Sequence, residues 1–319
     1  MLTSFEWRVK LTMHSVDVVV PVHNQALPLE LTLEGFARQT LPRDQYTLII
    51  VDDGSTEQIK LIAQRFCKSL SLRYIRLEHS GRAAARNAGA RAGSGDLIVF
   101  CDADRIPRTR FLEAHLQRAR TSSETIVTGQ VREMYVPNLA QNRMKARQQA
   151  VAERHDRIPQ YGQLMYRLFD EKGITSSPVA WAAALSGNLA VPREAFEQIG
   201  GFDEGFRQWG FEHFEFGYRA FRLGKQFGYE SQAVNVHLAH VRDRDAYVEH
   251  IRASHAYFLH KHPGPAVEKL LDFMLGYISL RQFETYAAEG RLPPSADDMP
   301  DLSEAQQDRD DGYVRIQNF

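Results

Sequence analysis

Short apolar runs alternate with stretches of helical spacing up to about residue 105, and this alternation restricts the fold more than any other feature. Four runs rich in β-branched and aromatic residues are typical of buried strands: Val16–Pro21, Tyr46–Val51, Leu72–Leu77 and Asp96–Cys101. Helical spacing falls between them, at 29–40, from Thr56 to Phe66, and at 83–92. Such alternation predicts an α/β fold with a mostly parallel central sheet and helices on both faces.

Beyond Asp104 the alternation is less regular. Residues of about 138–172 mix basic with apolar positions and predict a helical insert, either a solvated cover helix or a lid. Helical spacing returns through about Glu289, followed by an acidic, polar tail. We divide the chain into an N-terminal extension (1–14), a main domain (15–245, with halves 15–105 and 106–245) and a C-terminal helical segment with its tail (246–319).

Composition excludes several classes of protein. The chain has 39 Lys and Arg against 40 Asp and Glu, which argues against a general nucleic-acid binder. Cys67 and Cys101 lie in apolar segments, so we expect no disulfide framework and a cytoplasmic location. No apolar run approaches the roughly 20 residues of a membrane span, so any membrane contact, at the inner face, is expected to be peripheral. The helical insert and the C-terminal helical segment could form a homodimer, a point that their charge alone does not decide.

Asp102 and Asp104 follow the fourth predicted strand at alternate positions. Residues two apart in a strand point to the same side, so both carboxylates could converge on one divalent cation. By itself an Asp-x-Asp sequence is equally compatible with a solvated turn. The neighbouring clusters decide between the two interpretations.

Polar clusters also follow the first two strands. Pro21-Val22-His23-Asn24 offers an imidazole that could stack on a base and an Asn that could hold the loop. Asp52-Asp53-Gly54-Ser55 offers a carboxylate for a base N–H or for ribose hydroxyls, beside the backbone donors of the next helix. Each cluster taken alone could be an ordinary turn or helix cap.

Arg82 and Arg86 begin the third helical stretch, one turn apart, and could both face a diphosphate or a carboxylate. The carboxyl ends of parallel strands meet at one edge of a sheet, which is where α/β proteins bind ligands. The clusters are therefore expected to form one site.

Taken in order, these segments resemble the family 2 glycosyltransferases with the GT-A fold. The resemblance spans about Val16 to Arg244 and rests on Val-Val-Val-Pro-Val-His-Asn (18–24), Val-Asp-Asp-Gly-Ser (51–55), Ala-Arg-Asn-Ala-Gly (85–89) and Phe-Cys-Asp-Ala-Asp (100–104). It implies a Rossmann-like GT-A domain at 15–245, whose nucleotide-binding half is 15–105 and whose acceptor and metal half is 106–245.

The resemblance also implies roles for single residues. Pro21, His23, Asp53 and Arg82 would line the base and ribose, with Asn24 in the same loop. Asp104 would hold a metal ion, Mn²⁺ or Mg²⁺, on the donor diphosphate, while Asp102 would help through the ribose or a metal-bound water.

Three later segments resemble the acceptor-side region of chondroitin-polymerase-type domains and β-1,4-galactosyltransferases: Leu185–Phe196, Ile199–Glu204 and Trp209–Arg219. There Gly187 and Asn188 would border the sugar, and Trp209 would offer it a ring face unless it is a core residue. His240-Val-Arg-Asp243 resembles a metal-ligand segment, so His240 is favoured over His237 as the second metal ligand.

Three side chains are candidates for the base that deprotonates the acceptor. A helix that starts near Trp209 would place Glu212 and Glu215 on one face. Many relatives carry Glu-Asp where this chain has Glu212-His213, and their Asp is the base. Glu212 is the first choice, because a carboxylate retained there would face the cleft. His213 is the second, since imidazole ordinarily titrates near pH ~6.5, and Glu215 is the third.

The predicted function is metal-dependent, inverting transfer of a sugar from a nucleoside diphosphate sugar, most simply a UDP-sugar, to a hydroxyl. The acceptor could belong to a glycan, a lipid-linked saccharide, a peptide or a metabolite. A non-catalytic nucleotide-sugar-binding module is one alternative, because it would tolerate loss of the base. A sugar nucleotidyltransferase is another, but it predicts a Gly-rich basic loop after the first strand, which residues 21–25 do not provide.

Overall fold

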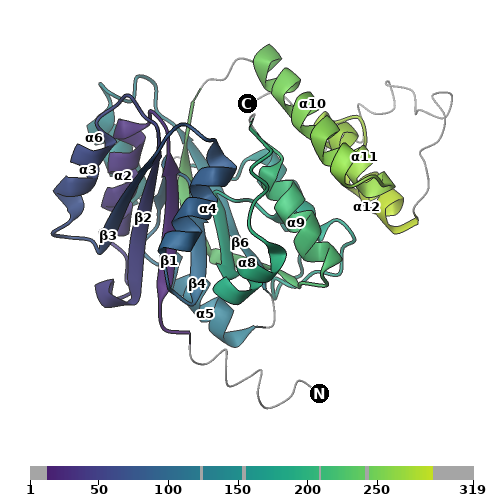
Figure 1. Cartoon of the computed structure of the whole chain (residues 1–319), viewed down its shortest axis with the longest axis horizontal. Helices are drawn as coiled ribbons and strands as arrows, with labels where there is room; N and C mark the ends of the chain where they lie inside the picture. The colour runs from purple at the N-terminus through teal and green to yellow at the C-terminus, as the bar shows by residue number, and fades with distance from the viewer. Residues whose placement is uncertain (1–12, 123–124, 153–155, 208–209, 241–243, 290–319) are drawn as a thin grey trace.

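A computed structural model describes residues 13–122, 125–152, 156–207, 210–240 and 244–289 (Figure 1). The predicted polar tail, Trp209 and most of the N-terminal extension lie outside these ranges. Within them, a central sheet is covered by helices on both sides, and further helices lie beyond one side.

The N-terminal half of the domain has the predicted alternation of strands and helices. Four parallel strands form it: β1 (Val16–Val22), β2 (Tyr46–Asp53), β3 (Leu72–Leu77) and β4 (Leu97–Cys101). Between them run α2 (Ala26–Phe36), α3 (Ile59–Phe66) and α4 (Arg82–Ala92). Helix α2 begins and ends three to four residues earlier than its apolar spacing predicts, and α3 begins three residues later than predicted. The other boundaries agree within two residues.

Four more strands extend this sheet with mixed directions: β5 (Arg105–Pro107), β6 (Ile126–Tyr135), β7 (Asn188–Pro192) and β8 (Phe227–Ala239). The eight strands lie in the order β3-β2-β1-β4-β7-β6-β8-β5. Strand β7 is antiparallel to both β4 and β6, and β5 is antiparallel to β8. Antiparallel neighbours need no helical crossover, which explains why the alternation fades after Asp104.

Alternate side chains of the parallel strands enter two separate cores. In β1, Val18 and Val20 pack with Phe36 and other residues of α2, α3 and α5 (Phe111–Thr121). Val19 points to the opposite face, where it packs with Ala85 of α4. That face is also covered by α8 (Arg193–Ile199) and α9 (Glu212–Arg222). Strands β1, β2 and β4 are therefore buried on both faces, as their apolar sequences predict, whereas β3 lies at the edge of the sheet and is only partly buried.

The predicted insert contains two helices, α6 (Arg143–Ala152) and α7 (Gln160–Tyr166). Helix α6 lies over α2, because Arg143 pairs with Glu30 and Arg147 pairs with Glu34. Its basic residues therefore bind a neighbouring helix, as in a cover helix. Residues 157–163, by contrast, line a cavity that is described below.

The C-terminal segment is helical as predicted and comprises α10 (Arg244–Lys261), α11 (Pro265–Met274) and α12 (Leu280–Glu289). Trp181, in the short 3₁₀ helix η2 (Ala180–Ala183), is fully buried and makes edge contacts with Phe258 of α10 and Phe283 of α12. These helices thus share the core of the main domain. None of the helices in the described ranges combines the length and the apolar character needed to cross a bilayer.

Candidate active site

A cavity of about 420 Å³ lies at the carboxyl ends of β1, β2 and β4. It gathers most of the residues that the sequence singled out, although they come from distant parts of the chain. Its lining includes Pro21, His23, Asp53, Arg82, Asp102, Asp104, Gly187, Glu212, His213 and His240. Asn24, Asn188 and Glu215 are not among the lining residues.

One end of the cavity is built around Asp53 of β2. Its buried carboxylate accepts hydrogen bonds from the backbone N–H groups of Ser80 (2.7 Å) and Gly81 (3.0 Å). The rings of His23 and His79 lie 4.4 Å apart, and both Nδ1 atoms face the Asp53 carbonyl oxygen. His79 was not expected from the sequence, because it lies in the β3–α4 loop and belongs to no recognisable motif.

Asn24 supports this end from outside the cavity. Its side-chain oxygen accepts hydrogen bonds from the backbone N–H (2.8 Å) and the hydroxyl (3.0 Å) of Thr56. The backbone N–H of Asn24 donates to the Ser55 hydroxyl (3.0 Å). Asn24 therefore fixes the loop after β2 and leaves His23 on the cavity wall.

The middle of the cavity is organised by Arg86, which is buried. One Nη donates to Asp102 (2.9 Å) and the other to Glu212 (2.8 Å), so Arg86 connects the end of β4 to the start of α9. Burial lowers the pKa of Arg86, but the charges of the two carboxylates more than offset this and raise it. Arg105 binds the second oxygen of Asp102 (3.2 Å). Both Asp102 oxygens therefore have arginine partners.

Gly187 is required by the same arrangement. A Cβ atom at this position would lie 2.2 Å from Nε of Arg105 and 2.6 Å from the Asp102 carboxylate. Only a residue without a side chain allows the Arg105–Asp102 pair to lie against this turn. Its neighbour Asn188 faces the protein interior, where it binds the side chain of His115 (2.8 Å) and the carbonyl oxygen of Ala233 (2.8 Å).

Asp104, His237 and His240 form a cluster suited to a divalent cation. Each offers one ligand atom, and these atoms all lie within 4.8 Å of one another. Gln25 donates to the Asp104 carboxylate (3.0 Å), which also lies 3.5 Å from Nε2 of His237. Burial acts to raise the pKa of Asp104, but His237, Arg105 and Gln25 hold it below its usual value, so the ligand is ionised.

This cluster differs in two respects from the metal ligands expected from the sequence. The sequence favoured His240 over His237, whereas both side chains lie beside Asp104. His237 lies there because β8 pairs with β5, which directly follows the Asp-x-Asp turn. Asp102 does not belong to the cluster in the described part of the chain, since its oxygens face Arg86 and Arg105.

Glu212 and His213 begin α9 beside the cluster. Glu212 is buried, and burial acts to raise its pKa, but the neighbouring His213 and Arg86 hold that pKa well below its usual value. Nδ1 of His213 lies 3.9 Å from the Glu212 carboxylate. This distance is too long for a hydrogen bond, so the carboxylate acts on the ring through its charge.

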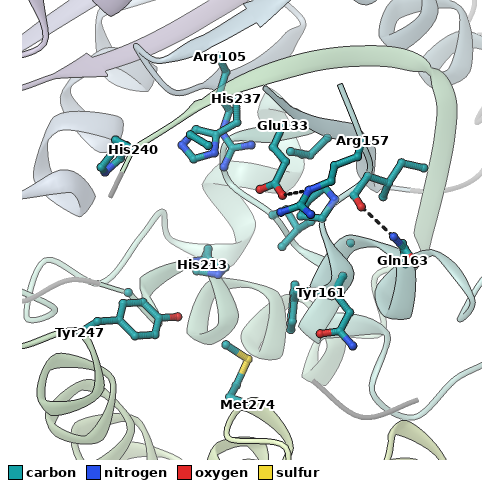
Figure 2. Close-up of a pocket in the computed structure, with 18 of the residues that line it drawn as sticks. Arg105, Glu133, Arg157, Tyr161, Gln163, His213, His237, His240, Tyr247 and Met274 are labelled. Carbon is teal, nitrogen blue, oxygen red and sulfur yellow. Dashed lines mark hydrogen bonds and ion pairs between the residues drawn. The ribbon is translucent and has the colours of Figure 1, made fainter. Parts of the chain in front are cut away.

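A second cavity of about 320 Å³ adjoins the first (Figure 2). Residues that line both cavities form the junction: Arg105, Leu185, Gly210, His213, His237 and His240. His213 thus lies between the two spaces and close to the candidate metal cluster.

Glu215, the third candidate base, lies in a different environment. Its fully buried carboxylate binds Arg219 of the same helix (2.8 Å) and His262 (2.9 Å), and lies 3.5 Å from Lys261. It therefore joins α9 to the end of α10. No described contact brings Glu215 to either cavity.

Replacing Glu215 by Gln is expected to lower the free energy of unfolding by about 2–3 kcal/mol, because it removes the buried carboxylate that binds the partly buried side chains of Arg219 and His262. Burial acts to raise the pKa of Glu215, but Arg219, His262 and Lys261 lower it below its ordinary 4.5. The stabilisation is therefore complete above pH 4.5 and lost as the pH falls further, so the two proteins should converge in acid. Urea unfolding at several pH values measures this, with exposed Glu197→Gln as the control; a constant difference at all pH values would contradict it.

Replacing Arg86 by Met is expected to destabilise the fold by about 3–5 kcal/mol, since it leaves the buried Glu212 carboxylate without its arginine and removes one of the two arginine partners of Asp102. Arg91→Met is the matched control, because it is in the same helix but its side chain is 67% exposed. Its effect should stay below about 1 kcal/mol. Thermal or urea unfolding compares the two, and equal effects would argue against the central role of Arg86.

Two family models match the chain. The family model "Glycosyl transferase family 2" matches residues 17–200, and the model "N-terminal domain of galactosyltransferase" matches 175–241. Validoxylamine A glucosyltransferase of Streptomyces hygroscopicus subsp. jinggangensis is 26% identical over 266 residues, covering 78% of this chain and 61% of that protein. Chondroitin synthase of Escherichia coli is 26% identical over 236 residues, covering 69% of this chain and 34% of that protein.

Solved structures share the fold at low identity. TarS (1–349) of S. aureus in complex with UDP has a TM-score of 0.59 at 16% identity, covering 87% of this chain and 76% of that chain. The mannosyltransferase PcManGT from Pyrobaculum calidifontis, in complex with GDP-Man and Mn²⁺, has a TM-score of 0.56 at 18% identity, covering 98% and 83%. The expected GT-A fold is thereby confirmed.

These comparisons limit what can be transferred to this chain. It spans less than two thirds of the length of either curated relative. The match of the first family model nevertheless extends over more than half of the chain, from β1 to the end of α8. The chain therefore belongs to family 2 of the glycosyl transferases.

Proposed function

We propose that this protein transfers a sugar from a nucleoside diphosphate sugar, preferentially a UDP-sugar, to an acceptor hydroxyl with inversion and with the help of a divalent metal ion. The observation that carries the proposal is the cluster of Asp104, His237 and His240, which lies in one cavity with Asp53 and beside His213. A nucleotide site, a cation site and a proton acceptor are thus combined in one cleft.

The donor would lie along the first cavity. Asp53, His23 and His79 offer hydrogen-bonding groups and ring faces for the base and ribose, and Arg82 at the start of α4 lies within reach of the diphosphate. Asp104, His237 and His240 would hold Mn²⁺ or Mg²⁺, which supplies positive charge to stabilise the departing diphosphate. The preference for UDP rests on the family resemblance, since the structural neighbours include complexes with both UDP and GDP-Man.

His213 is the better candidate for the base, although the sequence favoured Glu212. The Glu212 carboxylate is buried and bound to Arg86, and the resulting low pKa makes it a weak proton acceptor. His213 lies at the junction of the two cavities. The Glu212 carboxylate lies 3.9 Å from its Nδ1, close enough for its charge to stabilise the imidazolium that forms.

In the proposed reaction, the acceptor oxygen forms a bond to the anomeric carbon from the side opposite the diphosphate. The bond between that carbon and the phosphate oxygen breaks, and its electron pair leaves with the nucleoside diphosphate. The hydroxyl proton passes to the free ring nitrogen of His213. Attack from the opposite side inverts the anomeric centre.

The alternatives fit the site less well. A nucleotidyltransferase would need a Gly-rich basic loop after β1, whereas Pro21–Gln25 contains neither Gly nor a basic Lys or Arg. A binding module would need no proton acceptor beside the donor, yet His213 occupies this position. Dimerisation, peripheral membrane contact and a cytoplasmic location stay predictions from the sequence.

Release of nucleoside diphosphate from a panel of UDP-, GDP- and dTDP-sugars tests the function. We expect release from one or two donors with Mn²⁺ and none with excess chelator, measured with a coupled assay for the free nucleotide. Direct titration with UDP and GDP covers the case in which turnover requires an acceptor. Absence of both release and metal-dependent nucleotide binding would refute the proposal.

A further inference from the structure

The second cavity is lined largely by segments outside the parallel half of the sheet. Residues 157–163 of the insert form one wall, and Tyr247 of α10 and Met274 of α11 line the side shown at the bottom of Figure 2. None of these residues lines the first cavity. The insert and the C-terminal helices therefore determine the shape of this space.

Aromatic and apolar side chains form a large part of its wall. The hydroxyl of Tyr161 donates to the Ala182 carbonyl oxygen (2.8 Å), which holds its ring beside Phe214 at a centroid distance of 6.1 Å. Tyr247 and Met274 are also largely buried. Rigid ring faces of this kind bind the C–H faces of cyclic molecules, whose edges remain available to polar groups.

Polar groups occupy another part of the wall, as Figure 2 shows. The side chains of Glu133 and Arg157 are joined by a 2.7 Å ion pair, and their backbones exchange two hydrogen bonds (2.7 and 3.0 Å). The Glu133 carboxylate can accept hydrogen bonds from hydroxyls and the Arg157 guanidinium can donate to them. Because their charges cancel, this pair is suited to neutral hydroxyl groups rather than to a charged ligand.

The far side of the cavity limits the size of its ligand. Tyr247 and Met274 belong to helices that share the core of the main domain, so this wall cannot move aside without loss of core packing. The volume of about 320 Å³ is near the lower end of the range of small-molecule sites, which is ~300–1,000 Å³. A ligand of more than about two rings would extend beyond this volume.

We propose that the second cavity binds the acceptor and selects a compact, neutral cyclic polyol, a sugar or cyclitol of one or two rings, over a polysaccharide chain. This proposal rests on the proposed function, since it assigns the cavity opposite the donor across His213. A hydroxyl at the junction would face His213, with the ring against Tyr161 and Phe214 and the other hydroxyls near Glu133 and Arg157.

Ligand-observed NMR tests this binding without requiring turnover. The probes are methyl α-glucoside, methyl β-galactoside, myo-inositol, a disaccharide and a neutral glucose hexasaccharide, each with the full chain, UDP and Mn²⁺. We expect at least one compact probe to bind at least tenfold more tightly than the hexasaccharide. Binding should weaken at least tenfold in Met274→Trp, which fills the cavity, and in Arg157→Gln, whose largely exposed side chain makes misfolding a minor concern.

Met144→Trp is the control, because it makes the same change on the exposed surface of α6. It should bind the probes like the wild type, and all variants should keep Mn²⁺-dependent UDP binding. If the wild type did not bind UDP in the presence of Mn²⁺, the proposed function itself would fail. The acceptor assignment would be overturned if no compact probe bound, or if the hexasaccharide bound more tightly than the compact probes. It would also be overturned if Met274→Trp and Arg157→Gln bound the probes as tightly as the wild type does.

Discussion

Replacing Asp104 by Asn is expected to reduce metal-stimulated release of nucleoside diphosphate by about 1,000-fold. The change removes the only carboxylate of the cluster with His237 and His240 but keeps the size of the side chain and the possibility of a hydrogen bond with Gln25. A metal ion stabilises several kcal/mol of transition-state charge, and each 1.4 kcal/mol corresponds to about tenfold in rate. The measurement is release from the best donor at saturating Mn²⁺.

Two further readouts separate loss of the metal from loss of the fold. Mn²⁺ binding followed by electron paramagnetic resonance should weaken in Asp104→Asn, while the unfolding midpoint should stay within a few degrees of the wild type. Asp44→Asn is the matched control, because Asp44 is exposed in the short helix η1 (Arg43–Gln45), and it should behave like the wild type. Unchanged Mn²⁺ affinity in Asp104→Asn would rule out this cluster as the metal site.

The part of the fold that could be predicted is the part in which single strands can be recognised from their own apolar sequences. Strands β1, β2 and β4 are largely continuous apolar runs, and residues 18–20 and 48–51 are buried on both faces of the sheet. Strands β5 to β8 combine antiparallel with parallel pairing, and polar residues interrupt the apolar positions of β6 and β8, so their sequences lack this signal. Direction and order in this part depend on contacts that no single segment contains.

The site shows the same division. The loops after β1, β2 and β4 could be assigned to one edge because parallel strands end together. The contact between Arg86 and Glu212 could not be predicted, since 126 positions separate the two residues in the sequence. Nor could helical spacing show that Glu215 faces α10, because residues three apart differ by about 60° in direction around the helix axis. At the start of α9 this difference separates a residue of the cleft from a residue of the core.

Replacing His213 by Gln is expected to lower the rate of transfer to an acceptor by about 100- to 10,000-fold, the range that general base catalysis contributes. Binding of UDP and Mn²⁺ should change little, because the cluster of Asp104, His237 and His240 remains. Glu212→Gln tests the competing assignment. If Glu212 were the base, transfer would be largely retained in His213→Gln and lost in Glu212→Gln, and the proposal would fail.

The variant His213→Asp gives the sharpest test, because the family resemblance implies an Asp base at this position. A carboxylate can accept the hydroxyl proton as an imidazole does, whereas the side-chain amide of Gln cannot. In His213→Asp part of the transfer activity that is lost in His213→Gln should therefore return, measured with saturating donor, acceptor and Mn²⁺. Equal rates of transfer in the two variants would mean that His213 orients the acceptor rather than deprotonating it.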